Sequence, residues 1–292
     1  MRSRLAGIRP RVYFPRLDAG VSEQNRNGLF LLRIEDSLQF TAEIFNCFWD
    51  GAMKTIAIIP AGGAGKRMGG CVPKQYLSLA GIPILVHTLR VFQCSPLIDE
   101  ILLVVPEGDI PDVRRDLVQR YRISKVRLVL HGGKERQDSV RNALAHLREE
   151  DGGIVIHDGV RPFVTGDLIE RAVAGAEEFG AVTVGIPIRD TVKAVDAAGG
   201  VVKTVSREGL WLTQTPQAFR REVILAAYAR AEADGFYGTD DASLVERTGI
   251  PVRMIPGEMD NIKVTMPEDL ARGEMILRRF PRNAGKKVRG KE

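Results

Sequence analysis

The stretch TIAIIPAGGAGKRMGGCVPKQY, residues 55–76, decides how the folded part of the chain is interpreted. Its apolar run, Thr55 to Ile59, has the length and composition of a buried strand and stops at Pro60. Five glycines and three cations follow. Glycine lets the backbone approach a ligand closely, and backbone N–H groups with fixed cations hold phosphate. The stretch therefore predicts a phosphate-binding turn at the end of a strand.

Two familiar phosphate-binding loops do not fit this turn. The P-loop needs a glycine where Pro60 stands and a serine or threonine where Arg67 stands. The dinucleotide fingerprint fits at its first two glycines but needs a third where Met68 stands. The remaining pattern has Arg67 and Lys74 on either side of a flexible turn. Two cations so placed suit nucleotidyl transfer, because negative charge develops at the α-phosphate while pyrophosphate leaves. An ordinary glycine-rich turn with solvated cations is the alternative.

Strand-like and helix-like segments alternate from Lys54 onward. Strands are expected at 55–59, 101–105, 126–130, 154–156, 181–186 and 252–255. Helices are expected at 84–92, 113–121, 137–147, 168–178, 223–231 and 267–277. This order predicts an α/β fold with a mostly parallel sheet, helices on both faces and ligands at the carboxyl ends of the strands.

One segment breaks the alternation. Residues 191–195 and 201–205 flank a glycine-containing turn and predict a β-hairpin, within an arm of about 189–210. A hairpin outside the main sheet often embraces a partner subunit, and a local flap over the site is the alternative.

The net charge of +5 comes from the end of the chain. Residues 278–292 hold seven cations and one acid, and the rest holds 35 basic and 36 acidic residues. With few aromatic residues among the cations, this predicts no nucleic-acid partner and a disordered basic tail at 281–292. No apolar run approaches a bilayer span, so no membrane partner is expected. Cys47, Cys71 and Cys94 form no paired framework, which predicts a cytoplasmic location.

Residues 1–52 differ from the rest of the sequence. They are arginine-rich and interrupted by proline, and they lack the apolar core of a signal peptide, while their acidic residues argue against a transit peptide. We expect a non-conforming or disordered N-terminal extension, with Met53 as the true start and 53–280 as a single domain.

The sequence resembles the 2-C-methyl-D-erythritol 4-phosphate cytidylyltransferases of the non-mevalonate isoprenoid pathway. The resemblance begins at PAGGAGKRM and PKQY and spans about residues 54–280 in the family's order. Six further blocks carry it: GGKERQDSV (132–140), HDGVRPF (157–163), RDTVK (189–193), LWLTQTPQAF (210–219), GTDDAS (238–243) and NIKVTMPEDL (261–270). It implies a Rossmann-like nucleotidyltransferase sheet and a hairpin arm exchanged across a homodimer. It also implies CTP as substrate, Mg²⁺ as metal, and 4-diphosphocytidyl-2-C-methyl-D-erythritol and pyrophosphate as products.

The nucleotide side of the site is expected at the first two blocks. Arg67 and Lys74 are the expected catalytic pair that stabilises the α-phosphate. Nucleotide contacts are expected from Ala61, Gly62, Gly63 and Lys66, and cytosine selection from Gly133 and Ser139. Lys134 stands where the family often has an acidic residue, so its side chain is not expected to contact the base, and Arg136 and Asp138 are expected to brace that loop instead.

The metal and acceptor residues lie further along the chain. Asp158 follows a strand, and one carboxylate at a strand end facing phosphates is a natural Mg²⁺ ligand, with a turn-capping aspartate as the alternative. By resemblance, the acceptor is bound by Arg161, Thr191, Arg207, Thr239 and Lys263, and Thr215, which precedes Pro216, is expected to line the pocket. Thr191 and Arg207 flank the arm and are candidates for the neighbouring subunit's site. His157 is interpreted as structural, and Asp240 and Asp241 as helix-capping residues.

Three other functions remain as alternatives. The first is a pentitol-phosphate cytidylyltransferase, such as the ribitol 5-phosphate enzymes, or another sugar-phosphate nucleotidyltransferase. The second is a glycosyltransferase, although its usual Asp-x-Asp motif is missing from the sequence. The third is a non-catalytic nucleotide-binding regulator, which the joint presence of Arg67, Lys74 and Asp158 argues against.

Overall fold

The computed structural model describes residues 53–63 and 72–279. The chain divides into two units, Met1–Glu43 and Ile44–Glu292, and every described residue belongs to the second. The expectations for 1–52, for the tail at 281–292, and for Lys66 and Arg67 therefore fall outside the described residues. Within those residues, no helix combines the length and apolar character needed to cross a bilayer.

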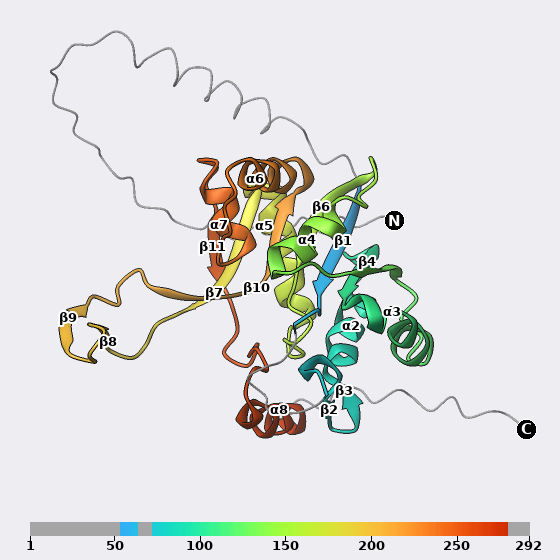
Figure 1. The fold of residues 1–292 in the computed structure, drawn as a ribbon, viewed down its shortest axis with the longest axis horizontal. Helices are drawn as coiled ribbons and strands as arrows, with labels where there is room; N and C mark the ends of the chain where they lie inside the picture. The colour runs from blue at the N-terminus through green and yellow to red at the C-terminus, as the bar shows by residue number, and fades with distance from the viewer. Residues whose placement is uncertain (1–52, 64–71, 280–292) are drawn as a thin grey trace, which may run out of the picture. The chain divides into compact units, whose positions relative to one another are not determined.

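Seven strands form one sheet in the order β11–β7–β10–β6–β1–β4–β5 (Figure 1). Their bounds are β1 (Lys54–Pro60), β4 (Glu100–Val105), β5 (Val126–His131), β6 (Asp151–Ile156), β7 (Ala181–Pro187), β10 (Trp211–Arg220) and β11 (Arg253–Pro256). β10 runs antiparallel to β6 and β7, and the other pairs are parallel. The expected mostly parallel α/β sheet is confirmed.

β10 is the strand that the sequence pattern did not predict. Pro216 lies in its middle, and a proline normally argues against a central strand. The strand accommodates it at a cis Thr215–Pro216 bond, where the pairing with β7 is irregular between Gln214 and Gln217. β10 thereby carries Thr215 to the carboxyl end of β6, where the site lies.

Helices cover both faces of the sheet, as expected. One face carries α2 (Ile84–Cys94), α3 (Ile110–Asp112) with its π-helical continuation η4 (Val113–Gln119), and α5 (Gly166–Phe179). The other carries α4 (Arg136–Leu144), α6 (Arg221–Ala233) and α7 (Asp241–Glu246). Because side chains alternate along a strand, Ala57 and Ile59 of β1 enter the first core, and Ile56 and Ile58 enter the second.

A third apolar cluster lies beside the carboxyl end of β1. It joins Leu79 and Ile84 to Val160, Phe163 and Ile276. Its elements are the short ladder of β2 (Ser78–Leu79) and β3 (Ile82–Pro83), which follows η2 (Lys74–Tyr76), and the last helix, α8 (Pro267–Arg279). Figure 1 shows α8 beside β2 and β3. The cluster connects the segment bearing Lys74 to the end of the described chain.

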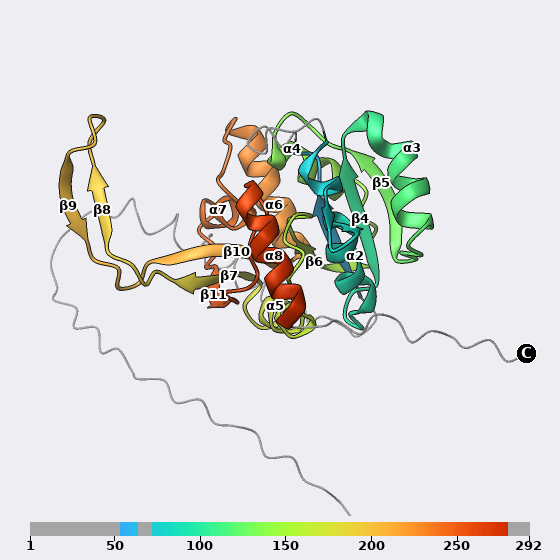
Figure 2. The ribbon, with the colours of Figure 1, turned by 90° about the horizontal axis from the view of Figure 1, so that it is seen from below.

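The predicted hairpin is confirmed as β8 (Val192–Val195) and β9 (Val201–Val205). Its turn is held by Asp196 Oδ1, which accepts hydrogen bonds from the N–H groups of Ala198 and Gly200, and Gly199 has a φ of 84°. The arm projects from β7 and β10, away from the helices (Figures 1 and 2). Val201 and Val202 are exposed on it.

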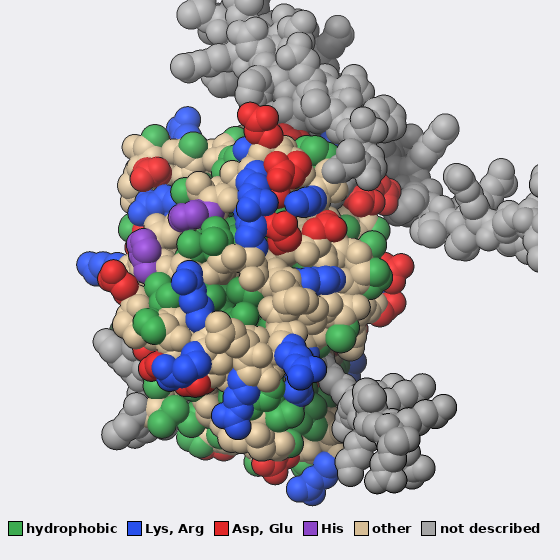
Figure 3. Space-filling model, turned by 90° about the vertical axis from the view of Figure 1, so that its right-hand side faces the viewer, with side chains coloured by type: hydrophobic (Ala, Val, Ile, Leu, Met, Phe, Trp, Pro, Cys, Tyr) green, Lys and Arg blue, Asp and Glu red, His purple; other side chains and the backbone are tan. Residues whose placement is uncertain are grey.

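The surface seen in Figure 3 carries mixed charge. Lysine and arginine side chains there are dispersed among acidic, apolar and neutral ones and do not merge into one continuous basic patch.

Candidate active site

The end of β1 opens into the glycine turn. Ala61 is buried, and its N–H extends the ladder with β4 through a bond of 2.7 Å. A Cβ added to Gly62 would lie 4.0 Å from Ser139 Oγ, and one added to Gly63 would lie 3.9 Å from Lys74 Cε. Gly62 and Gly63, the described glycines of the turn, therefore lie between the start of α4 and the side chain of Lys74.

The segment before α4 is a tight loop built around one glycine. The N–H of Gly133 donates to Ser139 Oγ at 3.1 Å, and that hydroxyl donates to Glu135 O at 3.2 Å. A Cβ on Gly133 would lie 2.2 Å from Asp138 Cβ, so only glycine fits without a shift. Glu135 and Asp138 cap α4 reciprocally, which confirms that Asp138 braces this loop.

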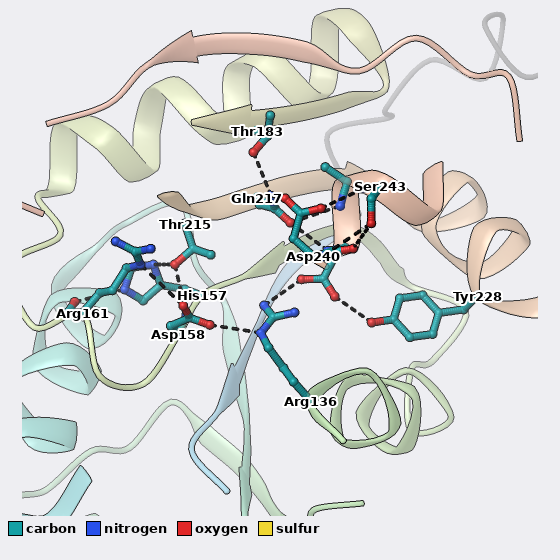
Figure 4. Close-up of polar contacts among 12 residues, drawn as sticks. Arg136, His157, Asp158, Arg161, Thr183, Thr215, Gln217, Tyr228, Asp240 and Ser243 are labelled. Atoms are coloured by element: carbon teal, nitrogen blue, oxygen red, sulfur yellow. Dashed lines mark hydrogen bonds and ion pairs between the residues drawn. The ribbon is translucent and has the colours of Figure 1, made fainter. Parts of the chain in front are cut away.

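Asp158 follows β6, and three cations surround it: Arg136 and Arg161, which Figure 4 shows beside it, and Lys263. Its Oδ2 lies 2.9 Å from Lys263 Nζ and 3.5 Å from Arg161 Nε, and its Oδ1 lies 3.1 Å from Arg136 Nε. Burial disfavours the charged form and raises the pKa of Asp158, but the attraction of Arg136, Lys263 and Arg161 outweighs it and holds the pKa far below its usual range. Asp158 is therefore an anion.

A hydrogen-bonded chain connects Asp158 to β10. Thr215 Oγ1 accepts from the N–H of Asp158 at 3.1 Å and lies 3.0 Å from His157 Nδ1. Burial lowers the pKa of His157 to about 4, so the ring is neutral near pH 7. Its Nε2 lies 3.1 Å from Arg161 O, which can only accept, so Nε2 carries the proton and Nδ1 accepts from the threonine hydroxyl. Both ring nitrogens are thus engaged, as expected of a structural histidine.

Hydrogen bonds hold the segment bearing Lys263 beside Thr215 and Arg161. Asn261 is buried, and its Nδ2 donates to Thr215 O at 2.8 Å. Arg161 Nη1 donates to Asn261 O at 3.0 Å. Because the anchor lies two residues before Lys263, the ammonium group reaches Asp158 from a fixed backbone.

Arg136 contacts a second carboxylate deeper in the molecule. Its Nη2 lies 2.7 Å from Asp241 Oδ2, and Tyr228 Oη donates to Asp241 Oδ1 at 2.6 Å. Asp241 is 1% exposed, and its backbone N–H is bound by a side chain of β10. Asp240 caps α7 by accepting from Ser243 N–H at 2.9 Å. The expectation of a capping role is therefore confirmed for Asp240 and wrong for Asp241.

A single carboxylate is available here for a metal. Across residues 53–63 and 72–279, no group of three or more histidine, cysteine, aspartate or glutamate side chains could hold an ion. Mg²⁺ nevertheless binds through one or two carboxylates when substrate phosphates supply its remaining ligands. Asp158 fits a site of this type, in which one carboxylate and substrate phosphates hold the ion together.

The other expected acceptor residues lie further out. Thr239 is exposed ahead of α7, in a loop that α4 supports through a 2.9 Å bond from Gly238 N–H to Gln137 Oε1. Thr191 and Arg207 are exposed where the arm begins and ends, and Arg207 Nη1 donates to Arg189 O. The structure thus gathers Asp158, Arg161, Thr215 and Lys263 in one site, beside the glycine turn with Lys74, and leaves Thr191 and Arg207 on the arm.

Four residues of this network were not predicted as such. Arg136 was expected only to brace its loop, and the contacts of Asp241, Tyr228 and Asn261 were not expected. Arg136, Asp241 and Asn261 lie within the sequence blocks quoted above, and those blocks were the signal that could have pointed to them. The sequence did not show which residue of one block contacts which residue of another.

The fold and the site together define an α/β nucleotidyltransferase. Lys74 beside the glycine turn and further cations near Asp158 supply the positive charge that transfer between phosphates requires. Residues 55–279 match the family described as "IspD: 2-C-methyl-D-erythritol 4-phosphate cytidylyltransferase". The chain belongs to this family and is a nucleotidyltransferase enzyme.

Similar proteins cover the same part of the chain. The 2-C-methyl-D-erythritol 4-phosphate cytidylyltransferase of Syntrophus aciditrophicus is 51% identical over 226 residues, 77% of this chain and 97% of that protein. The protein of the same name from Geobacter metallireducens is 51% identical over 229 residues, with coverages of 77% and 98%. The solved 4-diphosphocytidyl-2C-methyl-D-erythritol synthase of Anaerococcus prevotii has a TM-score of 0.69 at 31% identity, covering 78% of this chain and 97% of its own. The Thermus thermophilus 2-C-methyl-D-erythritol 4-phosphate cytidylyltransferase has a TM-score of 0.65 at 32% identity, with coverages of 77% and 100%.

Proposed function

We propose that this enzyme transfers the cytidylyl group of CTP to 2-C-methyl-D-erythritol 4-phosphate and releases pyrophosphate, as a step of the non-mevalonate isoprenoid pathway. The observation that carries the proposal is the group of three cations around Asp158, beside the glycine turn, in a chain half identical to cytidylyltransferases of that name. Ribitol 5-phosphate as the acceptor is not favoured, because these relatives are named for the methylerythritol substrate.

The reaction is a direct in-line displacement. An oxygen of the acceptor phosphate attacks the α-phosphorus of CTP, a new P–O bond forms, and the bond to pyrophosphate breaks. The acceptor phosphate is already anionic, so no general base is needed. Arg67 and Lys74 stabilise the charge that develops on the α-phosphate, which is the role of preorganised cations at such a centre. Support for Lys74 is its position against Gly63.

The nucleotide lies along the glycine turn. The backbone of Ala61, Gly62 and Gly63 faces the triphosphate, with Lys66 at its outer phosphates. Gly133 and Ser139 select cytosine, because a backbone carbonyl and a hydroxyl can accept from its exocyclic amine. Support comes from the proximity of Gly62 to the Ser139 hydroxyl, since the segment 133–139 lies next to the first residues after β1.

The acceptor phosphate binds among the cations near Asp158. Arg161 and Lys263 neutralise it, and Thr215 and Thr239 line the pocket. Thr191 and Arg207 complete the pocket from the neighbouring subunit of a homodimer formed through the arm. The exposed valines of the arm and its projection away from the helices support that arrangement.

Asp158 would hold Mg²⁺ together with phosphate oxygens of CTP. When bound, the ion neutralises part of the triphosphate charge and orients the leaving group. Asp158 is fit for this because its low pKa keeps it charged across the physiological range.

We further propose the cytoplasm as the location. Cys94 is a free and exposed thiol, which suits a reducing compartment. Fractionation of the native source with an antibody tests this, and recovery outside the cytoplasmic fraction contradicts it.

The activity is tested by measuring pyrophosphate release from CTP with each acceptor, methylerythritol phosphate and ribitol 5-phosphate, with Mg²⁺ or with a chelator. We expect turnover with methylerythritol phosphate and Mg²⁺. Turnover with ribitol 5-phosphate alone would overturn the proposed acceptor, and unchanged turnover in chelator would overturn the role of Mg²⁺.

A further inference from the structure

We propose that Arg136 is a positioning residue that fixes the orientation of the Asp158 carboxylate, and that Asp241 and Tyr228 fix Arg136 in turn. The inference rests on the proposed function, in which Asp158 takes part in the chemistry.

Three helices converge on this one arginine. Arg136 comes from α4, Tyr228 from α6 and Asp241 from α7, and all three helices pack on the same face of the sheet. Figure 4 shows Arg136 between Asp158 on one side and the carboxylate that Tyr228 also contacts on the other. Its Nε lies 3.1 Å from Asp158 Oδ1, and its Nη2 lies 2.7 Å from Asp241 Oδ2. The planar guanidinium fork presents donors in fixed directions to the two carboxylates, whereas the ammonium of a lysine is a compact charge on a flexible stem.

The three cations around Asp158 are not equivalent. Lys263 has a side chain that is 37% exposed, and both it and Arg161 are proposed to turn to the acceptor phosphate. Arg136 is tied to Asp241, which is only 1% exposed. When substrate arrives, Asp158 therefore exchanges its contact with Lys263, whereas its contact with Arg136 stays in place because the buried Asp241 holds the other end of that guanidinium.

A gain in folding stability does not explain why these charged side chains are buried. Burying an ion pair costs desolvation energy that the attraction often fails to recover, and well-packed apolar side chains of similar volume serve a core as well or better. The arrangement gives a fixed geometry instead, because one oxygen of Asp241 accepts from Tyr228 while the other pairs with Arg136. Partners of this kind behind a ligating carboxylate typically change activity by about 10- to 100-fold when removed.

The test uses the full chain and four single variants. Asp241→Asn removes the anchoring charge at constant shape, and Tyr228→Phe removes only the hydroxyl. Arg136→Gln removes the guanidinium, and Arg136→Lys keeps the charge without the fork. The matched control is Arg141→Gln, because Arg141 lies on the same helix and also bridges two carboxylates, Asp138 and Glu232. Thermal unfolding of each variant checks the fold.

We expect Asp241→Asn and Arg136→Gln to lower kcat by about 10- to 100-fold with an unchanged KM for CTP, and Tyr228→Phe to do so less. Arg136→Lys is expected to resemble Arg136→Gln, and Arg141→Gln the wild type. In the Arg136→Gln background, Asp241→Asn should have no further effect on kcat, since both act through one contact. Wild-type kcat in Asp241→Asn, or independent effects that multiply in the double variant, would overturn the inference. If Asp241→Asn does not fold, Tyr228→Phe decides by the same criteria.

A second readout does not depend on turnover. The ¹H–¹⁵N signal of Arg136 Nε–H should exchange slowly with solvent in the wild type and rapidly in Asp241→Asn. Equal exchange in both proteins contradicts the positioning role even if the enzyme is inactive with the tested acceptors. If the wild type is inactive with the tested acceptors but the expected difference in exchange is seen, the proposed function is contradicted and the positioning role of Arg136 stands.

Discussion

The ammonium group of Lys263 lies 2.9 Å from Oδ2 of Asp158, although Lys263 follows the last strand of the sheet and Asp158 follows a central one. The pair connects the two segments that are proposed to bind the acceptor and the metal. Asp158 holds the lysine in place before any substrate arrives, so an incoming phosphate meets a cation that is already oriented.

Removal of this lysine should weaken use of the acceptor. Lys263→Ala is expected to lower kcat/KM for the acceptor by about 10- to 100-fold, because a bond to a charged group contributes about 1.5–3 kcal/mol. The KM for CTP should change little. Steady-state pyrophosphate release with each substrate varied measures both. Arg272→Ala, an exposed cation on α8 near the same segment, is the control, and a rise confined to the KM for CTP would contradict the assignment.

Gly133 should not tolerate a side chain. Gly133→Ala places a Cβ 2.2 Å from Asp138 Cβ, so the loop must shift, at a cost of about 1–3 kcal/mol in the free energy of unfolding. The KM for CTP should rise as well, because the loop carries the proposed cytosine contacts. Urea unfolding and initial rates measure the two effects. In the control, Gly108→Ala, the new Cβ meets nothing within 4 Å, and equal losses in both variants would argue against the steric explanation.

Acid should loosen the start of α8. Asp269 Oδ2 accepts from the N–H groups of Thr265 and Met266, at 2.7 and 2.9 Å. Burial raises the pKa of Asp269, but these bonds outweigh it and lower the pKa. Since the folded pKa lies below the unfolded value of about 3.9, the stabilisation is present above that pH and is lost as the pH falls through the folded pKa.

We therefore expect Asp269→Asn to be less stable than the wild type at pH 7 and to lose less stability on acidification below about pH 4. Thermal unfolding across pH measures this. Glu274→Gln, which removes an exposed carboxylate of the same helix, is the reference variant. If the melting temperatures of the wild type and Asp269→Asn fell in parallel with pH, the Asp269 carboxylate would not contribute to the pH dependence of stability.

The arm should complete the site of a second subunit. Lys74→Ala and Arg207→Ala are each expected to be nearly inactive. When the two variants are unfolded together and refolded as a mixture, mixed dimers contain one site with both native residues, so activity should return. Each variant refolded alone is the control. No recovery, in a mixture that light scattering shows to be dimeric, would place Arg207 in the site of its own subunit.

The sequence was sufficient for the architecture because the sheet is built from local patterns. Apolar runs such as Thr55–Ile59 and the helical spacing in 168–178 each specify one element, and their alternation leaves few topologies. It failed at β10, where Pro216 argues against a central strand, although the pairing with β7 is irregular at that point and resumes at Gln217. It also extended α4 beyond Leu144, where the structure ends it.

By itself, the sequence determined the α/β alternation, the glycine turn, the arm and the family, since all are written in contiguous stretches. Only the tertiary structure decided what each charged side chain faces. Asp241 looked like a cap beside Asp240, yet it is a buried partner of Arg136 because α4 and α7 pack on one face of the sheet. Asp158 acquires its low pKa from three cations that lie apart in the chain. Charge interactions depend on distance through space, and that distance is set by packing.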